Sequence, residues 1–149
     1  MKVREAMTQN PVFCVPSDSA QKAAQLMRDR NVGSLPVVAD RDSCRLLGVV
    51  TDRDICIALV ANGLDSRTTT IEKLFTESPV TVREGENLDK AERAMQEHQI
   101  RRIPVVDADG RCIGIVAQAD LALKDKPEKV SKTVAEISKT EAGRPSIAA

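Results

Sequence analysis

Two segments of the sequence combine residue types that could bind a phosphorylated sugar. In residues 48–54 (GVVTDRD), an apolar run ends at Thr51 and Asp54 follows three positions later. A helix that begins at Thr51 would offer its open N-terminus to a phosphate or a ribose, with Asp54 accepting hydrogen bonds from sugar hydroxyls. The same spacing fits a purely structural capping box, in which the threonine and the aspartate bond each other's backbone. Both interpretations stay open for this segment.

A second segment, residues 114–120 (GIVAQAD), repeats the pattern with one change. Asp120 is kept, but Ala117 stands where the first segment has its threonine. A pure capping role would favour the hydroxyl and the carboxylate together, so the lone Asp120 favours a binding role. A favourable interaction with the helix dipole is the alternative.

Two arginines, Arg101 and Arg102, directly precede the apolar segment that starts at Ile103. Guanidinium forks match phosphate oxygens, so the pair could clamp a phosphate. A solvated turn between helix and strand is the structural alternative. Gly33 and Ser34 precede the similar apolar segment at residues 35–38, so two sites of this kind would differ in charge.

Residues for catalysis or metal binding do not group in this way. His98 is the only histidine, and its place near a predicted helix C-terminus suits a simple cationic role. The cysteines form no CxxC pair, so we expect no metal site and mainly core packing, with an exposed Cys44 as the exception. No nucleophile–base pattern and no glycine-rich phosphate loop occurs, so we expect no enzyme. The four cysteines are Cys14, Cys44, Cys56 and Cys112.

These segments lie in two copies of one unit. Pro11-Val12 matches Pro79-Val80, and residues 36–38 (PVV) match residues 104–106 at the same offset. The hydrophobic periodicity and turn residues predict a β-α-β-β-α order in each copy. The predicted strands are 12–15, 35–38, 46–50, 80–83, 103–106 and 112–116, and the predicted helices are 19–30, 51–62, 88–99 and one from about 118. Short helical turns are expected at 3–7 and 71–75, a terminal helix carries an apolar stripe at 130, 134 and 137, and 143–149 is expected to fray.

Composition excludes several classes of function. The 149 residues carry 22 basic and 22 acidic side chains, and a general nucleic-acid binder usually shows a basic excess. Two phenylalanines with no tryptophan or tyrosine provide no platform for stacking bases. No apolar run reaches about 18 residues and the first residues lack a signal peptide, so we expect a cytoplasmic protein without a membrane span. Each copy is too small for an independent core, so the copies should pack together.

At the quoted segments the sequence resembles the cystathionine-β-synthase (CBS) domain family in its tandem form, including its small stand-alone bacterial members. The resemblance implies an α/β (α+β) fold with two CBS repeats related by a pseudo-two-fold axis. The repeats are expected at 3–62 and 71–123, with a connector at 63–70 and a C-terminal helix and tail at 124–149. The family pattern implies adenosine nucleotides, such as AMP, ADP, ATP or NAD, in the clefts between the copies.

The resemblance also implies roles for individual residues. Asp54 and Asp120 would meet ribose hydroxyls, Thr51 would lie near phosphate, and Ala117 is a departure that places the second site in question. The remaining expected contacts are Arg53, Arg101 and Arg102 among the polar groups, and Leu35 and Ile103 beside adenine. A homodimer is implied, and a chain without an output domain needs a partner protein. We therefore expect a regulatory sensor; a stress- or redox-responsive interaction protein without nucleotide is the alternative, because four cysteines occur in a small chain.

Overall fold

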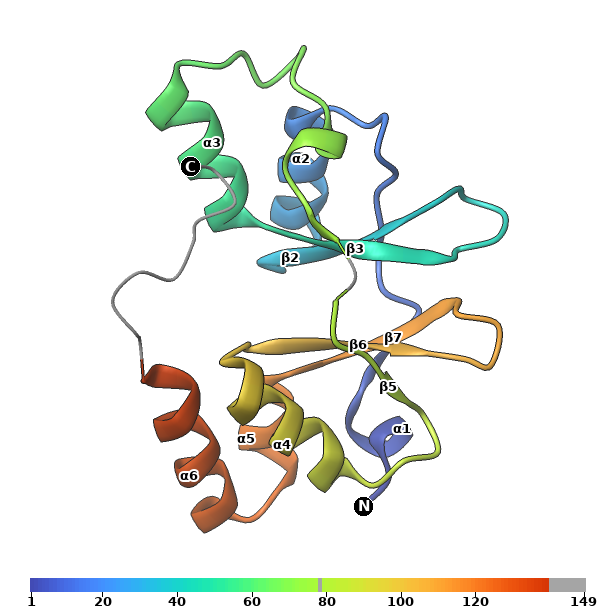
Figure 1. The fold of residues 1–149 in the computed structure, drawn as a ribbon, viewed down its shortest axis with the longest axis vertical. Helices are drawn as coiled ribbons and strands as arrows, with labels where there is room; N and C mark the ends of the chain where they lie inside the picture. Colours follow the sequence, from blue (N-terminus) through green and yellow to red (C-terminus); the bar gives the residue numbers. More distant parts are fainter. Residues whose placement is uncertain (78, 140–149) are drawn as a thin grey trace. The chain divides into compact units, whose positions relative to one another are not determined.

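The computed structural model describes residues 1–77 and 79–139, which form two compact units. Among these residues, one unit combines Met1–Pro11 with residues 80–139, and the other spans residues 12–77 with Pro79. Each unit is a small sheet with helices packed on it (Figure 1). The two-repeat α+β fold expected from the sequence is confirmed.

The unit Val12–Pro79 holds a three-stranded sheet in the order β2-β3-β4. Strands β2 and β3 form an antiparallel hairpin, and β4 adds antiparallel to β3. Helices α2 and α3 lie on the same face of this sheet (Figure 1). The elements are α2 (Ala20–Arg30), β2 (Ser34–Val38), β3 (Leu46–Thr51), α3 (Asp52–Asn62), the 3-10 turn η1 (Ile71–Lys73) and β4 (Thr76–Glu77).

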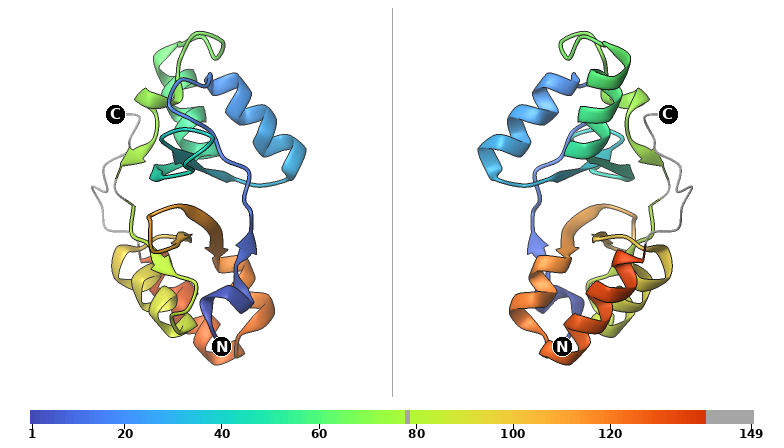
Figure 2. Two further views of the ribbon diagram at one scale, coloured as in Figure 1. Left: turned by 90° about the vertical axis from the view of Figure 1, so that its right-hand side faces the viewer. Right: turned by 90° about the vertical axis from the view of Figure 1, so that its left-hand side faces the viewer.

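The other unit holds a four-stranded sheet in the order β1-β7-β6-β5. Strands β5 and β6 are parallel and are joined through α4, whereas β6 and β7 form an antiparallel hairpin. Helix α6 packs beside α4 (Figures 1 and 2). The elements are α1 (Val3–Ala6), β1 (Thr8–Gln9), β5 (Val82–Arg83), α4 (Leu88–His98), β6 (Arg102–Val106), β7 (Cys112–Ala117), α5 (Gln118–Lys124) and α6 (Pro127–Ser138).

Local signals explain where the long helices begin and end. The Ser19 hydroxyl accepts a hydrogen bond from the Lys22 backbone N–H at 3.1 Å, which satisfies an orphan donor at the start of α2. Asn31 and Gln99 end α2 and α4 in the left-handed conformation, each with a φ of 52°. No helix of the described ranges is both long and apolar enough to cross a bilayer.

Each unit has its own hydrophobic core. In one unit the apolar face of α4, including Ala91 and Met95, meets Ile103 of β6 and Val116 of β7. In the other unit, Ala23 and Met27 of α2 meet Leu35 and Val50. Burial of the methionine, leucine, isoleucine and valine side chains contributes about 1.5–3 kcal/mol each, so packing rather than helix propensity holds the helices on the sheets.

The structural units do not coincide with the two sequence copies. Strand β1 lies in the expected first repeat (3–62) but pairs with β7, so the start of the first repeat completes the sheet of the second. Figure 2 (left) shows this N-terminal segment beside α5. The equivalent strand β4 lies in the expected second repeat (71–123) and pairs with β3 of the first. The expected repeat boundaries therefore stay a prediction about the sequence, whereas each folded unit contains an exchanged segment.

The other differences from the predicted elements are local. A strand over residues 12–15 was expected, but only Cys14 makes a bridge, to Val37, because Pro11 and Pro16 limit the backbone donors around it. The predicted strand at 80–83 is shortened to Val82–Arg83. The terminal helix is confirmed as α6, and the tail at 143–149 lies outside the described residues.

Glycine is required where the exchanged strands approach. A Cβ on Gly48 would lie 2.0 Å from the Thr76 carbonyl oxygen, and one on Gly114 would lie 2.6 Å from Met7 Sδ. We expect Gly48→Ala to lower the free energy of unfolding by about 1–3 kcal/mol, because β4 must shift. Urea denaturation would measure this loss. Gly85→Ala, where an added Cβ meets nothing within 4 Å, is the matched control, and equal stability of the two variants would contradict the prediction.

Candidate functional site

The start of α3 is a complete capping box. The Thr51 hydroxyl accepts from the Asp54 backbone N–H at 3.1 Å, and Asp54 Oδ2 accepts from the Thr51 backbone N–H at 3.0 Å. The structural interpretation of this segment is therefore realised. The capping box uses Oδ2 of the half-buried Asp54 carboxylate. Oδ1 of Asp54 makes no hydrogen bond within the described chain. One oxygen of Asp54 can thus hold the helix while the other accepts from a ligand.

The start of α5 repeats this geometry without the hydroxyl. Asp120 Oδ2 accepts from the Ala117 backbone N–H at 2.7 Å. The backbone of Ala117 (φ −107°, ψ 157°) is nearly that of Thr51 (φ −111°, ψ 160°). Asp120 therefore makes the carboxylate hydrogen bond of the capping box, although the threonine hydroxyl is absent. It occupies the same place at the start of α5 as Asp54 does at the start of α3.

This similarity predicts the effect of restoring the hydroxyl. Ala117→Thr should raise the free energy of unfolding by about 0.5–2 kcal/mol, because the new side chain can cap the Asp120 backbone N–H. Thermal or urea unfolding would show the gain. Ala119→Thr adds the same side chain inside α5, on an exposed position where it cannot cap. If the two substitutions had the same effect, hydroxyl capping at position 117 would be excluded.

Each unit places the residue that starts one strand opposite the residue that starts a helix. Ser34 pairs with Thr51, and Arg102 pairs with Ala117. The backbone contacts also match: the Asp52 N–H donates to the Gly33 carbonyl at 3.0 Å, and the Gln118 N–H donates to the Arg101 carbonyl at 2.8 Å. The structure thus brings the predicted arginine pair and the α5 start together, within one unit.

The two arginines are available to an anion. Arg101 is exposed and Arg102 is half-buried. Neither guanidinium forms a hydrogen bond or an ion pair with the rest of the described chain. The matching Gly33-Ser34 positions carry no charge, so the two units present different chemistry at equivalent places.

The other predicted contact residues have different surroundings. Leu35 and Ile103 have no exposed surface and belong to the hydrophobic cores, so neither side chain as placed offers a wall to adenine. Arg53 is exposed in the first turn of α3, and its backbone N–H donates to Asp52 Oδ1 at 2.8 Å. The six polar residues among the eight predicted ones therefore lie near the start of a strand or of a helix.

Two shallow grooves lie within single units, away from these residues. One, of about 400 Å³, is lined in part by Arg4, Arg83 and Asp107, and the other, of about 320 Å³, lies between α2 and α3 beside Ala24 and Leu59. Neither contains a predicted site residue, so the candidate site is defined by side-chain chemistry and backbone register.

The cysteines differ strongly in their surroundings. All four are free thiols. Cys14 is fully buried, its thiol donates to the Pro36 carbonyl, and burial, followed by the charge of Asp18, raises its pKa to about 12. Cys56 is exposed, and Cys44, expected to be exposed, is half-buried. The reactivity of Cys14 is therefore suppressed, since the thiolate is the reactive form.

The structure also groups residues that the sequence analysis did not single out. Asp89 and Glu92 of α4 converge with Asp125, which lies between α5 and α6. The spacing of Asp89 and Glu92 places them on one helix face, but the approach of Asp125 depends on tertiary packing.

The CBS domain family matches residues 3–61 and 71–125. Hypoxic response protein 1 of Mycobacterium tuberculosis is 41% identical over 112 residues, which are 74% of this chain and 76% of that protein. A crystal structure of Hypoxic Response Protein I with two coordinated zinc ions has a TM-score of 0.74 at 35% identity, covering 85% of this chain and 100% of that chain.

Two further similar structures hold adenosine compounds. The CBS domain pair of protein MJ0100, in complex with 5'-methylthioadenosine and S-adenosyl-L-methionine, has a TM-score of 0.73 at 30% identity, covering 83% of this chain and 94% of that chain. CBSX2 from Arabidopsis thaliana, in complex with AMP, has a TM-score of 0.67 at 31% identity, covering 93% and 98% of the two chains.

Proposed function

The chain belongs to the CBS domain family and carries two copies of its domain, and from this we propose that it is a regulatory module that binds an adenosine-containing ligand. The observation that carries the proposal is the Arg101-Arg102 dipeptide, unpaired among the described residues, beside the start of α5, where Asp120 presents a carboxylate. Guanidinium groups suit a phosphate and a carboxylate suits ribose hydroxyls. The adenosine ligands of similar CBS pairs support this assignment.

The two units would contribute unequally to ligand binding. Asp120 with Arg101 and Arg102 offers both an acceptor and two cations, whereas Asp54 with Thr51 and Arg53 offers an acceptor, a hydroxyl and one cation. The arginine pair favours a phosphorylated ligand in its unit. Leu35 and Ile103 are fully buried in the cores, so the polar residues carry the proposal.

The proposed output is a change in conformation or assembly rather than a reaction. A ligand that binds one arrangement of the chain more tightly shifts the population toward it. We propose that the chain forms a homodimer and that a partner protein receives the change, in line with a regulatory module that is not an enzyme.

Calorimetric titration of nucleotide-stripped protein with AMP, ADP, ATP, NAD and S-adenosylmethionine tests the proposal. We expect saturable binding of at least one of these compounds and a clear loss of affinity in Arg102→Ala. Arg28→Ala, which removes an exposed arginine from α2, is the control for net charge. Absence of binding to all five compounds would overturn the assignment.

The alternative, a redox-responsive interaction protein, rests on the cysteines and has its own test. We expect a thiol reagent at neutral pH to modify exposed Cys56 within minutes, and to modify buried Cys14 only on unfolding. Mass spectrometry of the modified peptides would measure both rates. Rapid oxidation of Cys14 with a change of oligomeric state would instead favour the redox function.

A further inference from the structure

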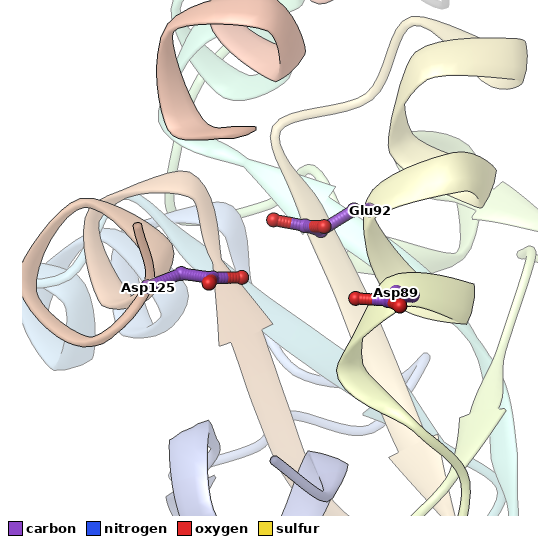
Figure 3. A group of neighbouring side chains, drawn as sticks. All are labelled: Asp89, Glu92 and Asp125. Carbon is purple, nitrogen blue, oxygen red and sulfur yellow. The ribbon is translucent and has the colours of Figure 1, made fainter. Parts of the chain in front are cut away.

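Three carboxylates from two parts of one unit face a common space. Asp89 and Glu92 project from α4, and Asp125 projects from the α5–α6 junction (Figure 3). One oxygen atom from each residue lies within 4.8 Å of the other two. Like charges at such distances repel each other, so the arrangement favours a bound cation or a proton on one of the carboxyls.

Glu92 shows that the compensation by protein groups is incomplete. Its side chain is only 5% exposed, and Oε1 is buried without a hydrogen-bond partner among the described residues. A buried polar oxygen without a partner is costly and uncommon in native proteins. Figure 3 shows the Glu92 carboxylate directed toward the space that it shares with Asp125 and Asp89.

Lys129 of α6 neutralises only part of the cluster. Its Nζ lies 2.6 Å from Asp89 Oδ1, and both of these side chains are exposed. An exposed pair of this kind is weak and can open at little cost. Asp125 Oδ1 accepts from the Lys126 backbone N–H at 2.7 Å, which does not supply a charge. Lys129 therefore leaves the Glu92 oxygen unsatisfied.

The donor atoms select a class of cation. All three ligands are carboxylate oxygens, which suit Mg²⁺, Mn²⁺ and Ca²⁺, whereas zinc sites are usually rich in nitrogen and sulfur. Metal–oxygen distances of about 2.0–2.6 Å place two ligands of one ion at most about 4–5 Å apart, as the cluster requires. We propose that Asp89, Glu92 and Asp125 bind one divalent, oxygen-preferring cation.

Such an ion would tie the C-terminal helix to the rest of its unit. α6 already contacts α4 through the Gln96 side-chain amide, which donates to the Thr133 hydroxyl at 2.8 Å. Near the start of α6, where the exposed Lys129–Asp89 pair already joins α6 to α4, the cation would add a connection between α4 and the junction that precedes Pro127. Occupancy of the site would thus set how firmly α6 is held.

The test uses the full chain, freed of nucleotide and stripped with a chelator. Mn²⁺ is the probe, because electron paramagnetic resonance counts the free ion directly, and thermal unfolding is followed with Mn²⁺, Mg²⁺ and Ca²⁺ in parallel. We expect one Mn²⁺ per chain and a rise in Tm. Glu92→Gln should weaken binding by about tenfold or more. Glu97→Gln, an exposed position on the same helix, should bind as the unaltered chain does.

Two results would overturn the site: no saturable Mn²⁺ binding at millimolar concentration, or unchanged binding in Glu92→Gln. Asp89→Asn changes an exposed residue and so provides a second variant if Glu92→Gln folds poorly. Retained affinity in that variant would also contradict the proposal. A larger Tm rise with Ca²⁺ than with Mg²⁺ would identify the more flexible oxygen site, and the reverse would identify an octahedral one.

Discussion

Asp54→Ala is expected to weaken binding of the adenosine ligand by about tenfold to a hundredfold, because a hydrogen bond to a charged group contributes about 1.5–3 kcal/mol. The carboxylate has one oxygen committed to the Thr51 N–H, and the other is proposed to accept from a ribose hydroxyl. Calorimetry with the ligand identified in the screen measures the loss. The same variant should also lose about 1 kcal/mol of stability through the broken capping box, which urea denaturation records separately.

Asp52→Ala provides the matched control for that experiment. It removes an aspartate of the same charge from the first turn of the same helix, and its side chain is exposed. Its carboxylate accepts only from the neighbouring Arg53 N–H among the described groups. If the affinities of Asp52→Ala and Asp54→Ala were equal, Asp54 would be a helix cap and the ligand assignment would fail at this residue.

Ionisation of Glu92 should lower the free energy of unfolding by about 3 kcal/mol as the pH rises from about 4.5 to about 7. This contribution of Glu92 alone is expected when a chelator keeps metal ions away. Burial, and next the Asp125 carboxylate, raise the pKa of Glu92 from 4.5 to about 7. The folded chain therefore binds more protons than the unfolded chain in this range, and stability decreases with pH. The charged groups that face Glu92 are Asp89 on α4, Asp125 at the α5–α6 junction and Lys129 on α6.

Denaturation at pH 5 and pH 8 would measure this change, and Glu92→Gln would separate it from other groups. The amide cannot ionise, so the difference between the two proteins should appear between these pH values. Carboxyls with lowered pKa, such as Asp18 beside Arg41 and Glu86 beside Lys90, act in the opposite direction at lower pH. Stability profiles of the same slope in both proteins would rule out the assigned role of Glu92.

Much of the fold follows from local sequence signals, because caps and turns are short-range. Ser19 and Thr51 mark helix starts, and the apolar periodicity of α4 predicts its buried face. The exchanged strands β1 and β4 could not be predicted in the same way. Each has two residues and an exposed burial pattern, so its pairing depends on a distant partner rather than on its own side chains.

The candidate site shows the same division. The polar residues of the helix starts could be predicted from their repeated spacing, and the register of Arg102 with Ala117 follows from the hairpin. The full burial of Leu35 and Ile103 could not be predicted, because apolar residues at strand positions do not reveal which face is buried until the packing is known. Asp125 joins Asp89 and Glu92 only through the packing of three helices, which no local pattern records.

The exchange of N-terminal segments also bears on how the chain leaves the ribosome. Thr8 is synthesised about a hundred residues before its partner Ile115, so β1 must wait for most of the chain to emerge. The hairpin β2–β3 can form early, yet its edge is covered only when β4 appears. During translation the nascent chain therefore carries an open strand edge, the kind of surface that chaperones shield. For the same reason, neither half of the chain would complete its sheet if it were produced alone as a fragment.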